Sequence, residues 1–248
     1  MTKPTRTVRA RELATRIERE LGKVGEPERA EQEKRYLKST LVHFGVSVPA
    51  TRKLVHAAWR QSGALTRADL LQTVELLWAR GVYELRSAAV MLLEAHGELL
   101  QAADLPHIER LIRNSHTWAL VDELAARVTG ALVERFPRLL RTLDRWAKDD
   151  DFWVRRSAML ALLLPLRRGE GAFERFARYA DTMLEQEEFF IRKAIGWVLR
   201  ETSKERPELV YRWLLPRAAR ASTVTLREAV KYLPAKQRTR VLQASRSS

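Results

Sequence analysis

Apolar residues recur along most of the chain at spacings of three and four, the period of an amphipathic α-helix. The first such stripe is formed by Leu13, Ile17 and Leu21, and the helix it predicts ends near Gly25 and Pro27. Similar segments follow, separated by breaks near Pro49, Gly63, Gly81, Pro106, Pro137, Gly169, Pro207 and Pro234. No segment alternates as a strand would, so the sequence predicts an all-α fold.

The two ends of the chain lack this apolar period. Residues 1–10 are polar and basic and include Pro4, which predicts a flexible basic arm with order beginning near Arg11. We expect a single helical-repeat domain over residues 11–240 and a frayed tail over 241–248.

One apolar anchor position repeats along the chain. The anchors are Leu85, Leu120, Val154, Ile191 and Leu226, separated by 35, 34, 37 and 35 residues. A period of this length is typical of stacked helical pairs. The sequence therefore predicts a HEAT-like helical-repeat solenoid.

Basic residues follow these anchors. Arg86, Arg155, Arg192 and Arg227 come directly after an anchor, and Arg156 and Lys193 come two residues after one. Because two residues turn a helix by about 200°, the second group is expected to point away from the buried stripe. A concave basic groove suited to a phosphate backbone would result, although solvated surface arginines would give the same pattern.

Composition narrows the possible partners. The 248 residues carry a formal net charge of +14, which favours a polyanion, and no cysteine, which excludes disulfides and thiolate chemistry. The five histidines show no metal-ligand spacing, so we expect no metal and no cofactor. Without an apolar leader or a run long enough to span a bilayer, the chain is expected to be cytoplasmic, with no membrane partner.

Two segments carry candidate chemistry. Trp118 and Asp122 are four residues apart, which places an indole and a carboxylate on one helix face. Trp197 lies four residues after Lys193, with Gly196 leaving room beside it. Taken singly, each has an ordinary structural explanation, namely an ion-paired aspartate or a tryptophan in helix packing.

In order and spacing, three segments resemble the signature segments of AlkD-type DNA alkylation repair glycosylases. They are Trp118–Asp122, Trp153–Arg156 and the long Phe189–Arg200 run, and the likeness extends from about Ala30 to Leu233. The resemblance implies a HEAT-like fold and a monofunctional glycosylase that excises cationic N3- or N7-alkylated purines. Its expected partner is duplex DNA containing those lesions, bound by a monomer.

The resemblance also implies roles for individual residues. By position, Asp122 would be the catalytic carboxylate, Trp118 and Trp197 the aromatic walls of the cleft, and Arg156 a DNA contact beside the lesion. The DNA-binding residues expected from the resemblance and the basic repeat positions are Tyr36, Arg86, Trp153, Arg155, Phe190, Arg192, Lys193 and Arg227. The tryptophans expected to be structural are Trp59, Trp78, Trp146 and Trp213.

The segment around Trp118 departs from the family pattern. The family often has a second aromatic before the catalytic indole and an acidic residue after it, whereas this chain has Thr117 and Ala119. Lesion preference or rate is therefore expected to differ. Two alternatives stay open: a non-catalytic HEAT-like nucleic-acid-binding module, and a protein-binding scaffold whose groove takes an acidic helix or tail.

Overall fold

A computed structural model describes residues 6–246, and the remaining residues of the expected arm and tail lie outside that range. Within it, the regular structure is helical except for one isolated parallel bridge between Val42 and Val82, which confirms the all-α prediction. The chain forms two compact units, one up to Leu124 and one from Ala125 onward. The division falls inside a π-helical turn, Leu124–Thr129, and each unit is described by itself.

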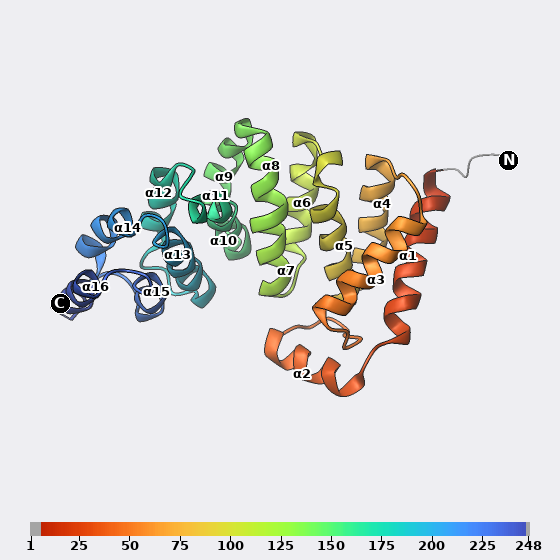
Figure 1. The fold of residues 1–248 in the computed structure, drawn as a ribbon, viewed down its shortest axis with the longest axis horizontal. Helices are drawn as coiled ribbons and strands as arrows, with labels where there is room; N and C mark the ends of the chain where they lie inside the picture. Colours follow the sequence, from red (N-terminus) through yellow and green to blue (C-terminus); the bar gives the residue numbers. More distant parts are fainter. Residues whose placement is uncertain (1–5, 247–248) are drawn as a thin grey trace. The chain divides into compact units, whose positions relative to one another are not determined.

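The first unit is built around helices that pack in neighbouring pairs, α1 with α3 and α4, and α5 with α3, α4 and α7 (Figure 1). Its helices are α1 (Arg6–Lys23), α2 (Pro27–Leu37), α3 (Val48–Gln61), α4 (Arg67–Trp78), α5 (Tyr83–Ala95), α6 (Leu105–Arg113) and α7 (Trp118–Glu123). Two 3₁₀ turns, Gly97–Leu99 and Ala102–Asp104, join α5 to α6.

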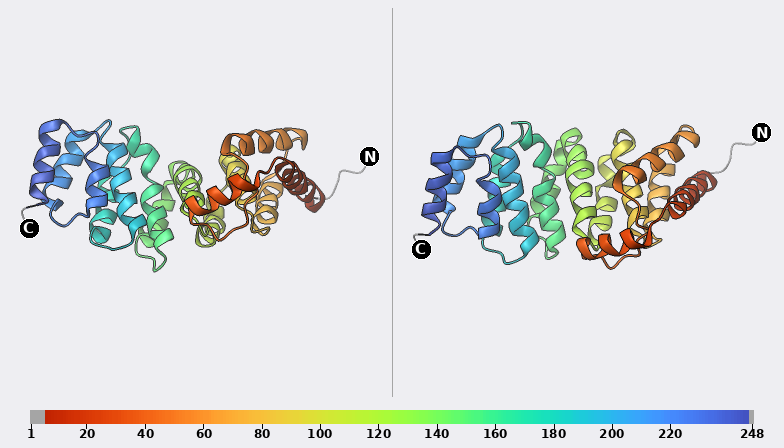
Figure 2. Two further views of the ribbon diagram at one scale, coloured as in Figure 1. Left: turned by 90° about the horizontal axis from the view of Figure 1, so that it is seen from below. Right: turned by 60° about the horizontal axis from the view of Figure 1, so that its bottom comes forward.

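The second unit is a further stack of helices that run side by side in two rows, coloured green to blue in Figure 2. They are α8 (Gly130–Arg135), α9 (Leu140–Trp146), α10 (Phe152–Leu160), α11 (Leu163–Arg167), α12 (Phe173–Met183), α13 (Phe189–Thr202), α14 (Pro207–Leu214), α15 (Thr223–Ala229) and α16 (Ala235–Ala244). The 3₁₀ turns Pro137–Leu139 and Leu215–Arg217 complete it. Helix α13 packs against α10, α11 and α15, so it is central to this unit.

Local sequence explains where the helices begin and end. Thr66 and Asp69 form a reciprocal capping box at the start of α4, and Ser222 caps α15 by accepting from the Thr225 amide. Pro207 is the first residue of α14, where its missing amide hydrogen is not needed. The predicted breaks at proline and glycine coincide with helix ends.

The repeat anchors are confirmed as core residues. Each is at most 6% exposed, and they lie on five successive inner positions, in α5, α7, α10, α13 and α15. This burial follows from the stacking of helical pairs, because each pair must cover one apolar face of the next.

Both predicted terminal boundaries need correction. Helix α1 begins at Arg6, not near Arg11, because Ala10 is fully buried and extends the apolar stripe by one turn. At the other end, α16 continues to Ala244 because Val241 is fully buried and anchors it. None of the described helices is long and apolar enough to cross a membrane.

Candidate active site and basic ties

The start of α7 is fixed by a contact with the end of α2. The Thr117 hydroxyl, 2% exposed, donates a hydrogen bond to the Leu37 carbonyl at 3.2 Å. That carbonyl lies at the C-terminus of α2, where backbone acceptors lack partners within the helix. Thr117, one of the two departures from the family pattern, is thus a buried tether between α2 and α7.

This tether brings two aromatic rings together. Tyr36 on α2 meets Trp118 on α7 edge-on, with ring centroids 5.9 Å apart and planes at 77°. The tyrosine side chain is 73% exposed, and the indole is half-buried. An edge-to-face pair with one exposed member leaves electron-rich surface open to a cationic ligand.

Asp122 lies one helical turn after Trp118 on α7 and is 7% exposed. The helix then opens into the π-helical turn Leu124–Thr129, a distortion that often accompanies functional sites. We call Tyr36, Trp118 and Asp122 the α7 site. As the sequence predicted, the indole and the carboxylate are on neighbouring turns of one helix.

Arg86, predicted as a DNA-binding residue, is a buried side chain in the first unit. It is 9% exposed, its guanidinium donates to the carbonyls of Trp78 and Asn114, and it lies over the Trp78 ring at 5.0 Å. Burial lowers the pKa of this guanidinium. Neighbouring segments cover this flank of α5, and Arg86 ties α4 to the segment before α7.

Arg156 in the second unit is also buried and also bonds a backbone carbonyl. It is 2% exposed, donates to the carbonyl of Phe190 and lies 5.8 Å over that ring. The helix turns by about 200° between anchor and Arg156 as expected, but the adjacent repeat covers this flank. The predicted outward contact is therefore wrong, and Arg156 ties α10 to the start of α13.

The other basic repeat positions differ in exposure. Arg155 is mostly buried and donates to the carbonyls of Asp149 and Asp150 at 2.8 Å, and Arg192 donates to the Gln186 carbonyl at 2.8 Å. Arg227 on α15 is exposed. Of the three side chains, that of Arg227 is the most exposed and therefore the most accessible to a phosphate group.

Lys193 belongs to a charged cluster between α13 and α15. Its ammonium donates to Glu228 at 2.8 Å, and Arg200 and Lys231 bond the same carboxylate. Burial alone would raise the pKa of Glu228, but the hydrogen bonds from Lys193 and Lys231 and the charge of Arg200 outweigh it and lower the pKa to about 2. Three cations share one carboxylate, so the cluster keeps a positive balance.

Gly196 serves this helix contact. A Cβ there would lie 2.7 Å from Glu228 Cβ and 2.8 Å from the Thr225 carbonyl oxygen. The glycine thus allows α15 to approach α13. Trp197 itself is half-buried on α13.

An aromatic cluster marks the starts of α10 and α13. Trp153 lies 4.3 Å from Phe152 and 4.9 Å from Phe190, measured between ring centroids, and Phe189 adds a ring that is 55% exposed. Sequence reasoning named Trp153 and Phe190 but missed Phe152 and Phe189. The sequence did contain a signal for them, because an aromatic pair stands directly before each of two repeat anchors: Phe152 and Trp153 before Val154, and Phe189 and Phe190 before Ile191.

The remaining tryptophans are structural, as predicted. Trp78, Trp146 and Trp213 are each at most 8% exposed, and Trp59 stacks on His96 with ring centroids 3.5 Å apart.

The stacked helical pairs define a helical-repeat protein. Its α7 site consists of the indole and the carboxylate of α7 together with the exposed tyrosine of α2 that meets the indole. A family model described as DNA alkylation repair enzyme matches residues 17–233. The chain belongs to the DNA alkylation repair enzyme family.

Solved structures agree with this assignment. A protein from Enterococcus faecalis, described as a predicted DNA alkylation repair enzyme, is 25% identical with a TM-score of 0.77, and the match covers 85% of this chain and 97% of that one. AlkD2 from Streptococcus mutans is 19% identical with a TM-score of 0.57, covering 91% and 100%. The smu.31 protein of Streptococcus mutans UA159 is 18% identical with a TM-score of 0.58, covering 84% and 98%. The last two show the fold alone. A search of curated proteins finds no significant match.

Proposed function

We propose that this protein is a monofunctional DNA glycosylase that hydrolyses the N-glycosidic bond of cationic N3- or N7-alkylated purines in duplex DNA. The α7 site carries the proposal, because Asp122 lies one turn from Trp118 and Trp118 meets the exposed Tyr36. Membership of the DNA alkylation repair enzyme family supports the same reaction class.

The chemistry requires a carboxylate more than an acid. Alkylation at N3 or N7 already makes the purine cationic, so it leaves as a neutral base without being protonated. Bond cleavage builds positive charge on the deoxyribose, which the Asp122 carboxylate stabilises while orienting the attacking water. Water oxygen bonds to C1′, the glycosidic electron pair goes to the purine nitrogen, and one water proton is released.

The aromatic rings explain selectivity for charged lesions. A cationic nucleotide against the face of Trp118 or Tyr36 gains about 0.5 to 2 kcal/mol per contact, and a neutral purine gains less. The 73% exposure of Tyr36 leaves its ring free to make that contact. Trp197 of the second unit is proposed, from its place in the chain, as a further aromatic contact to the same DNA.

DNA phosphate contacts are assigned to the accessible basic residues. Arg227 is exposed and Lys193 retains 42% side-chain exposure, so both can reach a phosphate. Trp153 and Phe190 are proposed to lie along the DNA. Arg86 and Arg156, which are buried, are proposed as positioning residues that hold their helices in register, and Arg155 and Arg192 join them because they bond backbone carbonyls.

The test is base release from 7-methylguanine and 3-methyladenine DNA under single-turnover conditions, comparing the intact protein with Asp122→Asn. We expect release by the intact protein, and a loss of at least about a hundredfold with Asp122→Asn while DNA binding persists. Glu12→Gln, which removes one exposed negative charge from α1, is the matched control and should retain release.

The same measurement separates the alternative function. If the intact protein binds DNA tightly with strong salt dependence but releases neither base, the non-catalytic nucleic-acid-binding module replaces the glycosylase. Weak DNA binding that does not depend on the lesion would instead favour the protein-binding scaffold.

A further inference from the structure

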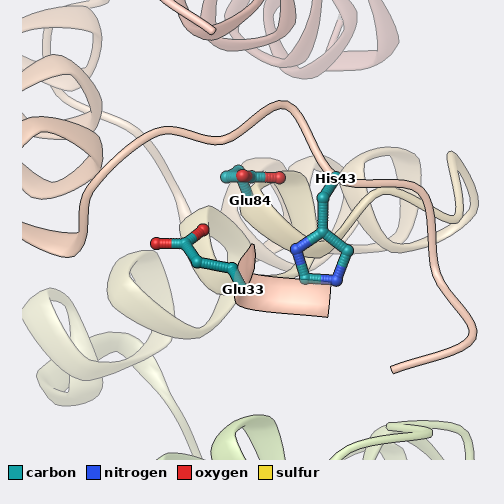
Figure 3. A group of neighbouring side chains, drawn as sticks. All are labelled: Glu33, His43 and Glu84. Atoms are coloured by element: carbon teal, nitrogen blue, oxygen red, sulfur yellow. The ribbon is translucent and has the colours of Figure 1, made fainter. Parts of the chain in front are cut away.

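Three potential metal ligands converge in the first unit, and none of them is a residue of the α7 site. Glu33 comes from α2, His43 from the loop between α2 and α3, and Glu84 from α5 (Figure 3). One ligand atom from each lies within 4.8 Å of the other two. Figure 3 shows one imidazole nitrogen turned toward the two carboxyl groups.

His43 is held in place but lacks polar partners. Its ring stacks on Tyr83 with centroids 4.8 Å apart and planes at 13°. Both ring nitrogens are buried and have no hydrogen-bond partner in the structure, and the same holds for Glu33 Oε2. Buried polar atoms normally have partners, so the imidazole nitrogen turned toward the carboxyl groups and Glu33 Oε2, both without one, indicate a missing ligand between them.

Glu84 makes the pocket rigid. It is 1% exposed, and its carboxylate accepts hydrogen bonds from the amides of Phe44, Gly45 and Val46 at 2.9, 2.7 and 3.1 Å. Two carboxylate oxygens offer about four acceptor positions, so one remains for a cation. The amide bonds fix the loop that carries His43.

The loop is also bound to α5 through its backbone. Tyr83 donates its amide to the Val42 carbonyl at 2.8 Å, and Val42 donates to the Gly81 carbonyl at 3.1 Å. These bonds fix the loop that carries His43 against the start of α5. Glu33 on α2, whose Oε1 pairs with the Arg29 guanidinium at 2.7 Å, is the ligand expected to adjust, through its unpartnered Oε2.

We propose that Glu33, His43 and Glu84 form a binding site for one zinc-like divalent cation, completed by water. One nitrogen and two oxygen ligands suit Zn²⁺, which accepts three protein ligands and an open position. Zn–ligand distances of about 2.0 to 2.2 Å put tetrahedral ligand atoms about 3.4 Å apart, so ligand atoms that now lie up to 4.8 Å apart must approach one another by as much as about 1.4 Å when the ion binds.

The consequence is a link between α2 and α5. Glu33 lies three residues before Tyr36 on α2, so a cation held by Glu33 and Glu84 would fix the helix that presents the exposed tyrosine. The metal-site proposal can be tested independently of the proposed glycosylase activity, because its test measures metal binding and not base release.

The experiment uses the full chain without a histidine tag, stripped with a chelator and titrated with zinc chloride by calorimetry. We expect one equivalent to bind, and the melting temperature to rise by about 5 °C when zinc is in large excess over its Kd. His43→Phe, which keeps the ring stack on Tyr83 but removes both nitrogens, should weaken binding at least tenfold, and Glu33→Gln should do the same.

His107→Phe is the matched control. His107 also contacts a carboxylate, that of Glu75 at 3.0 Å, but the Arg110 guanidinium lies in the same cluster in place of a third ligand. This variant should bind zinc like the intact protein. Absence of saturable binding by the intact protein, or unchanged binding by a folded His43→Phe variant, would overturn the proposal and leave a water-filled polar pocket.

Discussion

Tyr36 and Trp118 meet edge-on at 5.9 Å although they are far apart in the sequence and lie on helices of different repeats. The Thr117 hydrogen bond to the Leu37 carbonyl connects the residues next to each ring. Two neighbouring contacts therefore set the position of the indole relative to the tyrosine, and through α7 they set the turn that carries Asp122.

Removing the ring of Tyr36 should reduce activity with little effect on stability. We expect Tyr36→Ala to slow release of 7-methylguanine about tenfold, because one aromatic contact to the cationic nucleotide is lost. The free energy of unfolding should change by less than about 0.5 kcal/mol, since the side chain is 73% exposed. Single-turnover release and urea denaturation measure the two effects. Tyr36→Phe keeps the ring and should keep the rate; an equal loss in both variants would assign the effect to the hydroxyl.

Arg86 and Arg227 should respond in opposite ways to the same substitution. Arg86→Met leaves the Trp78 and Asn114 carbonyls without their partner and should lower the free energy of unfolding by about 2 kcal/mol. Arg227→Met should leave stability nearly unchanged but weaken DNA binding and reduce its salt dependence. Urea denaturation and binding titrations at several salt concentrations test the pair. A stable Arg86→Met protein with weakened DNA binding would instead support the DNA contact predicted for Arg86 from the sequence.

Gly196→Ala should destabilise the second unit. The added methyl would lie 2.8 Å from the Thr225 carbonyl oxygen, so α13 and α15 must separate at a cost of about 1 to 3 kcal/mol. Gly22→Ala in α1 is the control, because nothing lies within 4 Å of the new Cβ and alanine favours a helix. Thermal unfolding of both variants measures the difference, and equal melting temperatures would rule out tight packing at Gly196.

The carboxylate of Glu228 should make stability depend on acid pH. Its neighbouring cations lower its pKa to about 2 in the folded protein, below the ordinary 4.5, so its contribution to stability is present above pH 4.5 and is lost as the pH falls toward 2. Glu228→Gln should lower stability at pH 7 by about 2 kcal/mol and flatten the loss between pH 4.5 and 2. Denaturant melts at a series of pH values test this. An unchanged slope in Glu228→Gln would show that other carboxylates cause the acid dependence.

Local sequence was sufficient for the elements and for one part of the candidate site. The apolar period gave the helices, because each amphipathic stripe must face a partner, and proline and glycine marked their ends. The spacing of Trp118 and Asp122 placed both on α7 for the same local reason. The terminal boundaries were missed because Ala10 and Val241 act as core residues only once neighbouring helices cover them.

What the sequence alone determined was therefore the helical content, the repeat anchors and the pairing of an indole with a carboxylate on one helix. Tertiary structure decided which basic residues are accessible, because a neighbouring repeat covers the flank that carries Arg86 and Arg156. It also decided that Glu33, His43 and Glu84 converge, since their ligand atoms come from two helices and a loop with no motif spacing. Helical periodicity is a short-range property, whereas burial and convergence depend on which helices become neighbours.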